Sequence, residues 1–185
     1  MRSLDPLTNQ GTRTMITSIL QYTPVWVWGL LAGLIALGTS MAFTREITLR
    51  RATIMPLAMV GLSLYGVASV FSHQPLALGA WAVGLAVSAS IAIGMGIGRG
   101  AAWVPETRLL RVPGSWWPLV VILGIFITKF AVGVTLALHP DFARDSAFAT
   151  SVGLVYGAFS GVFLGRGTAL WKAAQAGIAR ATSLA

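Results

Sequence analysis

Long apolar runs, separated by short polar segments, make up most of this chain. A transmembrane helix needs about 20 mostly apolar residues to cross about 30 Å of hydrocarbon. Five runs meet this requirement, and they lie at residues 24–43, 54–71, 76–98, 116–138 and 148–171. The pattern therefore predicts an all-α, polytopic membrane protein that contains a bundle of five transmembrane helices.

Residues at the ends of these runs have the chemistry of helix starts and membrane interfaces. Thr23, Ser115 and Asp145 each stand shortly before a run, where short polar side chains cap helix N-termini. Most tryptophans also lie near run ends, where indole rings prefer the interface between membrane and water: Trp26, Trp28, Trp103, Trp116, Trp117 and Trp171. Both features support the predicted limits of the spans.

The polar segments at the two ends of the chain flank a single membrane domain. We expect the five-helix transmembrane domain to cover residues 15–172 and a cytoplasmic tail to cover residues 173–185. Residues 1–14 form a polar N-terminal extension, and a start at Met15 would make this extension dispensable.

One loop is long enough to have a structure of its own. In the segment Arg99–Ser115, two short runs of β-forming residues, 103–104 and 109–112, flank a central turn that contains Pro105. This arrangement predicts a short, hairpin-like cytoplasmic loop, with a plain amphipathic loop as the alternative.

Basic residues are concentrated on alternate loops. The chain has 13 Lys and Arg against 5 Asp and Glu, a formal net charge of +8. Nine basic residues follow the first, third and fifth runs or lie at their ends: Arg45, Arg50, Arg51, Arg99, Arg108, Arg111, Arg166, Lys172 and Arg180. On the opposite side, Arg144 stands alone between runs. Because short cytoplasmic loops are enriched in Lys and Arg, we expect the nine on the inner face, the N-terminus outside and the C-terminus in the cytoplasm. The block 45–51 could also contact anionic lipid, although topology alone accounts for its charge.

Small residues form stripes on two of the runs. In the last run they are spaced by four and so share one helix face: Gly153, Gly157, Gly161 and Gly165. The run 76–98 repeats this spacing less strictly: Gly84, Ser88 and Gly96. Lipid provides no hydrophobic drive for helix association, so close approach through small residues supplies dispersion contacts instead. We expect these two runs to pack on each other, or one stripe to receive a second copy or a partner protein.

Lys129 is a charged residue deep inside a predicted span. It lies nine residues before Leu138, about 14 Å along a helix and more than a lysine side chain reaches. A charge at this depth costs about 2.5–3.5 kcal/mol and indicates a functional site by default. No Asp or Glu lies within a span, so Lys129 must be deprotonated, reach a water-filled cavity or bond to hydroxyls and carbonyls. Its candidate partners are Tyr65, Tyr156 and Ser160, and a purely structural lysine is the alternative.

Composition and motifs exclude several classes of function. The chain is 56% hydrophobic and 10% charged, less than half the charge of a typical soluble domain, which excludes disordered chains, nucleic-acid modules and most soluble enzymes. It has no Cys, and His73 and His139 are expected to be ordinary histidines at helix ends. No dinucleotide-binding, phosphate-loop, zinc-protease or paired-carboxylate pattern occurs. We therefore expect no cofactor, no metal and no nucleic-acid partner.

Three stretches are distinctive when taken together: TREITLRRATIMPLAMVGLSLYGVAS at 44–69, VPGSWWPLVVILGIFITKFAVGV at 112–134 and YGAFSGVFLGR at 156–166. They resemble a family of uncharacterised bacterial integral membrane proteins, found mainly in proteobacteria. The resemblance implies a bacterial cytoplasmic membrane and about five helices. The arrangement is also loosely similar to small multi-pass proteins associated with cytochrome c biogenesis, but this chain has no cysteine for a thiol relay.

Two functions are compatible with these features. The first is an accessory or scaffold protein of the inner membrane, which packs through its glycine faces and contacts the bilayer, a second copy or a membrane-protein partner. The alternative is a small transporter or channel in which Lys129, with Tyr65 and Tyr156, marks a path for protons or anions. A membrane enzyme has less support, because no acid, base or metal set converges.

Overall fold

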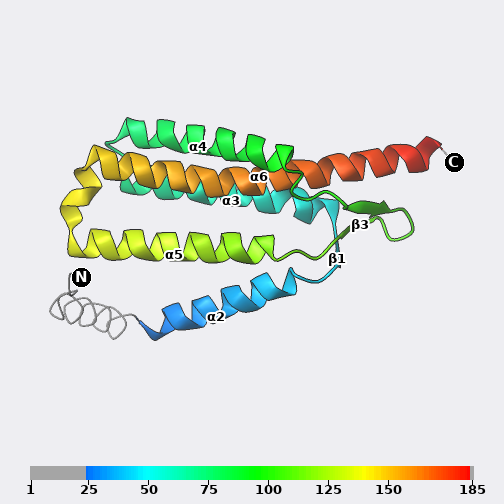
Figure 1. Cartoon of the computed structure of the whole chain (residues 1–185), viewed down its shortest axis with the longest axis horizontal. Coiled ribbons are helices and arrows are strands. Elements are labelled where there is room, and N and C mark those ends of the chain that lie inside the picture. The colour runs from blue at the N-terminus through cyan, green and yellow to red at the C-terminus, as the bar shows by residue number, and fades with distance from the viewer. Residues whose placement is uncertain (1–23, 184–185) are drawn as a thin grey trace, which may run out of the picture.

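Helices dominate the fold, as the apolar runs predict. The computed structural model describes residues 24–183. Its elements follow in the order α2 (Val25–Ser40), β1 (Arg45–Ile47), α3 (Leu49–Val70), α4 (Pro75–Gly94), β2 (Ala102–Val104), β3 (Leu109–Val112), α5 (Trp117–Leu138), the 3-10 helix η1 (Pro140–Arg144) and α6 (Ser146–Ser183). The long helices lie roughly along one axis, with the strands at one end (Figure 1). The all-α prediction is confirmed.

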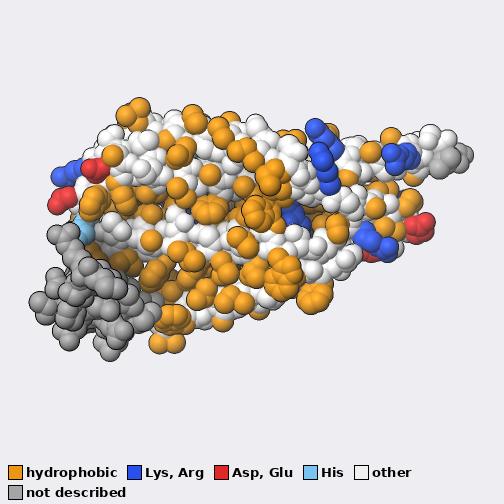
Figure 2. Space-filling model, viewed as in Figure 1, with side chains coloured by type: hydrophobic (Ala, Val, Ile, Leu, Met, Phe, Trp, Pro, Cys, Tyr) orange, Lys and Arg blue, Asp and Glu red, His pale blue; other side chains and the backbone are white. Residues whose placement is uncertain are grey.

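Four of these helices, α3 to α6, are long and apolar enough to cross a membrane. Helix α2 is apolar too but has only 16 residues, about 24 Å against about 30 Å of hydrocarbon. Hydrophobic side chains cover the length of the bundle, and charged side chains gather at its two ends (Figure 2). The chain is therefore a membrane protein with at least four candidate spans, and the fifth span stays a prediction.

Helix ends differ from the predicted limits where local contacts decide them. Helix α2 stops at Ser40 because the chain turns away there, and the Met41 carbonyl accepts a hydrogen bond of 3.1 Å from the backbone N–H of Ser115. Helix α3 starts earlier than predicted, at Leu49, since the side chain of Thr48 caps it by accepting from the N–H of Arg51. At the start of α6, Asp145 Oδ1 accepts from the N–H of Phe148 at 2.7 Å, which is the predicted capping role.

One prediction about sequence limits is wrong. Gly96 is not part of a helix face, because α4 ends at Gly94 and Gly96 lies in the following turn with a φ of 70°. Residues 173–183 of the predicted cytoplasmic tail are helical, because α6 continues without a break to Ser183, and their location in the cytoplasm stays a prediction. At 38 residues, α6 is about 57 Å long, so nearly half of it extends past the hydrocarbon. The proposed start at Met15 lies outside the described residues.

Helices α4 and α6 pack with their backbones in contact. A side chain on the α6 stripe would overlap backbone atoms of α4: Gly153 faces the carbonyl of Ala77, Gly157 that of Trp81, Gly161 that of Leu85 and Gly165 that of Ala89. Gly84 of α4 lies in the same way against the carbonyl of Leu154, and Ser88 lies beside Gly161. The glycine stripe of α6 is therefore covered within the chain, as the first of the two packing hypotheses predicts.

A three-stranded antiparallel sheet closes the end of the bundle from which α3 and α5 start. The predicted hairpin forms as β2 and β3, and β1 adds a third strand on the other side of β3, in the order β1–β3–β2. Its apolar face packs on the extension of α6 in a cluster of buried residues: Ile47, Ala52, Leu110, Val112, Leu170 and Ala174. The sheet therefore fixes the start of α3 and the second half of α6 relative to each other.

Candidate functional site

Lys129 lies near the middle of α5 and turns towards α3 and α6. Its Nζ atom stands over the ring of Tyr156, 4.8 Å from the ring centroid, at a distance typical of a cation–π contact. On α3 the neighbour is Gly66, where an added Cβ would lie 3.6 Å from Nζ. The ammonium group therefore lies at van der Waals distance from the place of a Cβ at position 66.

Hydroxyl groups of α3 and α6 hold the turn that carries Tyr156. The backbone carbonyl of Tyr156 accepts hydrogen bonds from Ser63 Oγ at 3.1 Å and from Ser160 Oγ at 2.9 Å. The indole N–H of Trp81 donates to Ser63 Oγ at 3.1 Å. Residues of α3, α4 and α6 thus position the Tyr156 ring beneath the ammonium group.

Three cavities meet at Lys129. A small one of about 110 Å³ lies on the sheet side of it, lined by residues that include Met59, Ser63 and Ser160. A second, of about 420 Å³, continues towards the opposite end of the bundle past Tyr65 and Ser69. The third is an apolar groove of about 850 Å³ between α2, α3 and α5, and its size is that of small-molecule sites.

The predicted partners of Lys129 differ in their roles. Tyr156 is in contact with it, whereas the hydroxyl of Ser160 bonds to the backbone instead. Tyr65 lines the same cavity as Lys129, but its side chain is 72% exposed. Residue patterns did not indicate Ser63, Gly66 or Trp81, because their contacts arise only when three helices pack together.

No carboxylate neutralises Lys129 within the part of the chain that the structure describes. The ion pair found there joins Glu46 and Arg111 at 3.0 Å, on the sheet. Residues 24–183 also contain no group of three His, Asp or Glu that could hold a metal ion. What the site offers is a cation with an aromatic ring beneath it and apolar walls, an arrangement suited to holding an anion.

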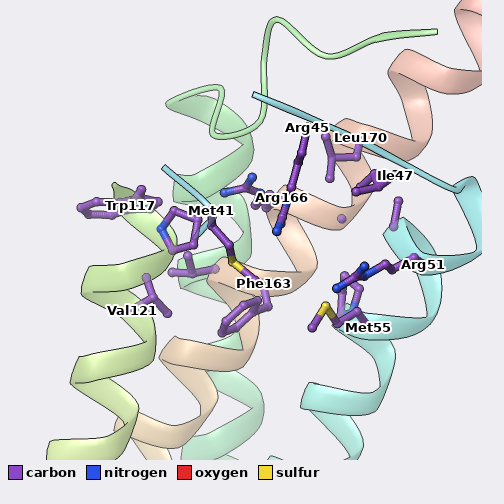
Figure 3. Close-up of a pocket in the computed structure, with 15 residues that line it drawn as sticks. Met41, Arg45, Ile47, Arg51, Met55, Trp117, Val121, Phe163, Arg166 and Leu170 are labelled. Atoms are coloured by element: carbon purple, nitrogen blue, oxygen red, sulfur yellow. The ribbon is translucent and has the colours of Figure 1, made fainter. Parts of the chain in front are cut away.

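A second group of cations lies at the sheet end of the bundle. Arg45 of β1, Arg51 of α3 and Arg166 of α6 line one pocket, and Figure 3 shows their side chains directed towards the space between the helices. Arg50, the fourth predicted inner-face residue of this set, is exposed and does not line it. Burial, and to a lesser degree the charge of Arg51, lowers the pKa of Arg45.

The chain belongs to a family whose model is described as "Family of unknown function (DUF6622)" and matches residues 3–181. This confirms the predicted membership of an uncharacterised family. Bacterial origin and the looser likeness to cytochrome c biogenesis proteins stay predictions. No curated protein and no solved structure matches the chain.

Proposed function

We propose that the protein carries organic anions across a membrane, with the ammonium group of Lys129 as the central binding site. The observation that supports this is the place of Lys129 at the meeting point of cavities that extend towards both ends of the bundle. A transporter needs a binding group in mid-membrane that can be approached from either side. The alternative of a lysine held by backbone carbonyls has less support, since no such hydrogen bond occurs among residues 24–183.

The walls around Lys129 indicate which anions fit. Met59, Leu62 and Phe163 line both the groove and the small cavity beside it. Apolar walls cannot replace the hydration shell of a small inorganic anion, so such ions pay a large desolvation penalty. An anion with an apolar body loses little hydration there and still places its charge beside the ammonium group.

Flux measurements test this proposal. Vesicles containing the purified protein should take up benzenesulfonate, a permanent anion with an apolar ring, when a K⁺ gradient and valinomycin make their interior positive. In Lys129→Met we expect uptake to fall about 10- to 100-fold, because a contact to a charged group is worth about 1.5–3 kcal/mol. A pH-sensitive dye inside the vesicles reports proton flux in the same experiment.

The matched control is Lys172→Met, which removes an exposed lysine from α6 outside the cavities. It should leave uptake unchanged, and both variants should unfold at the same temperature. If Lys129→Met transports benzenesulfonate as well as the wild type, the proposal is wrong. Proton flux without anion uptake would replace the organic anion by a proton as the transported species.

An accessory or scaffold function is the second candidate, but its predicted mechanism has lost support. The glycine stripe of α6 is covered by α4 and cannot also bind a partner. The two candidates differ in one observable property: a scaffold protein would co-purify with a partner from native membranes and tolerate Lys129→Met.

For orientation, we propose a bacterial cytoplasmic membrane with five spans and the sheet on the inner side. The nine basic residues assigned to the inner face lie in the sheet and its hairpin turn, at the start of α3, after α4 or in the second half of α6, whereas Arg144 lies beside Asp141 and Asp145 at the other end. The positive-inside rule then places the sheet in the cytoplasm.

Cysteine labelling tests this orientation directly, because the 185-residue sequence contains no Cys. Arg108→Cys on the hairpin and Asp141→Cys after α5 are both at exposed positions. In intact cells a membrane-impermeant maleimide should label Asp141→Cys and should reach Arg108→Cys only after lysis. The reverse result would invert the orientation, and labelling of both in intact cells would mean that α5 does not span the membrane.

A further inference from the structure

The three arginines at the sheet end come from parts of the chain that are far apart in sequence. β1 contributes Arg45, the first turns of α3 contribute Arg51, and the last third of the predicted fifth span contributes Arg166. Arg45 and Arg166 are partly buried. In Figure 3 the side chain of Arg45 extends into the space between Arg166 and Arg51.

This arrangement brings like charges together in a partly desolvated place. The nearby carboxylate of Glu46 pairs with Arg111 on the sheet. An arginine keeps its proton at neutral pH even in such surroundings, so the repulsion among the three guanidinium groups remains. An anion between them would replace that repulsion by charge-assisted hydrogen bonds, and guanidinium groups match the oxygen geometry of phosphate well.

The pocket beneath the arginines is apolar and opens towards the groove. Met41, Met55 and Phe163 line both the pocket and the groove of about 850 Å³ between α2, α3 and α5. The groove follows the helices from Met41 at the basic end, past Leu34, Ile122 and Lys129, to Trp26 and Ala137 near the opposite end. A lipid site needs a charged pocket for the headgroup and a long apolar groove for the acyl chain. The arginine pocket and the groove between α2, α3 and α5 provide these two parts.

We propose that Arg45, Arg51 and Arg166 bind the phosphate of an anionic membrane lipid whose acyl chain lies in the groove between α2, α3 and α5. Basic pockets between transmembrane helices are a recurring mode of lipid headgroup recognition. A free phosphate ion would bind to the arginines but would leave the apolar groove without a ligand. The groove also reaches Lys129, but lipid binding at the three arginines does not depend on the anion flux proposed there.

Lipid binding to the purified, full-length protein tests the proposal. The probes are phosphatidylglycerol, phosphatidylcholine with the same acyl chains, and inorganic phosphate, each added to protein in a neutral detergent while bound lipid and the unfolding temperature are measured. We expect phosphatidylglycerol to bind and to stabilise the protein, and the other two to have little effect. Removing two of the charges with Arg45→Gln and Arg166→Gln should weaken phosphatidylglycerol binding about tenfold or more.

The control is Arg50→Gln, which removes the same charge beside the pocket without changing its lining. Its affinity should stay close to that of the wild type. Because the two substitutions relieve repulsion among the arginines, the lipid-free double variant should unfold at the same or a higher temperature than the lipid-free wild type, so weaker binding cannot be attributed to misfolding. Equal binding by the double variant, equal binding of phosphatidylcholine, or equal stabilisation by inorganic phosphate would each overturn the proposal.

Discussion

Replacement of Gly157 by leucine is expected to lower the free energy of unfolding by about 3 kcal/mol or more. An added Cβ at this position overlaps the backbone carbonyl oxygen of Trp81, and no change of side-chain rotamer can relieve an overlap with backbone. The two helices must separate, and the contacts of Gly153 and Gly161 with α4 weaken with them. Overpacking usually costs about 1–3 kcal/mol, and a closely packed backbone places this site at the upper end. Unfolding of the detergent-solubilised protein by increasing concentrations of a denaturing detergent measures the effect.

Gly79→Leu is the matched control for Gly157→Leu. It makes the same substitution on α4 at a position where an added Cβ has no neighbour within 4 Å. We expect this variant to be as stable as the wild type or slightly more stable, because leucine has a higher helix propensity than glycine. Equal stability of the two leucine variants would contradict the packing of α4 on α6.

The packing of α4 on α6 was predictable from the sequence because the glycines that permit it lie close together in the sequence of α6. Four glycines at a spacing of four must share a helix face, and a face without side chains allows another helix to pack closely on it. Gly96 shows the limit of the same reasoning. Its spacing continues the stripe of α4, but Gly96 and Gly98 adopt positive φ values of 70° and 98°, and the helix has already ended.

The sheet was only half predictable, for a different reason. The hairpin of β2 and β3 lies within one short segment that has β-forming residues on both sides of a turn. β1 has three residues, and its pairing of Glu46 with Arg111 joins positions 65 residues apart. In the sequence the charges around β1 were fully explained by topology, so nothing indicated a strand there.

At the candidate site, Lys129 was predictable but most of its surroundings were not. A lysine in the middle of an apolar run is conspicuous in any sequence, because the bilayer makes such a charge costly. The hydrogen bond from Ser63 to the carbonyl of Tyr156 spans 93 residues, and Gly66 becomes a neighbour only when α3 lies beside α5. The cavities depend on how loosely α5 packs, and no residue pattern on α5 encodes that.

Replacement of Leu110 by alanine is expected to destabilise the sheet by about 2–5 kcal/mol, the cost of truncating a fully buried leucine. Leu110 is 0% exposed, sits on the central strand and pairs with Ile47 of β1 on one side and Trp103 of β2 on the other. Hydrogen exchange should therefore become faster in all three strands, whereas α4 and its partner face on α6 should keep their protection.

The control for Leu110→Ala is the neighbouring Leu109→Ala, which truncates a partly exposed leucine on the opposite face of the same strand and should have a much smaller effect. Loss of the sheet also removes the support of Arg45, because Arg45 pairs with Val112 in the β1–β3 ladder. Leu110→Ala should thus weaken phosphatidylglycerol binding without removing any charge, and Leu109→Ala should not. Unchanged exchange in β1 together with full lipid affinity in Leu110→Ala would mean that the sheet does not hold Arg45 in place.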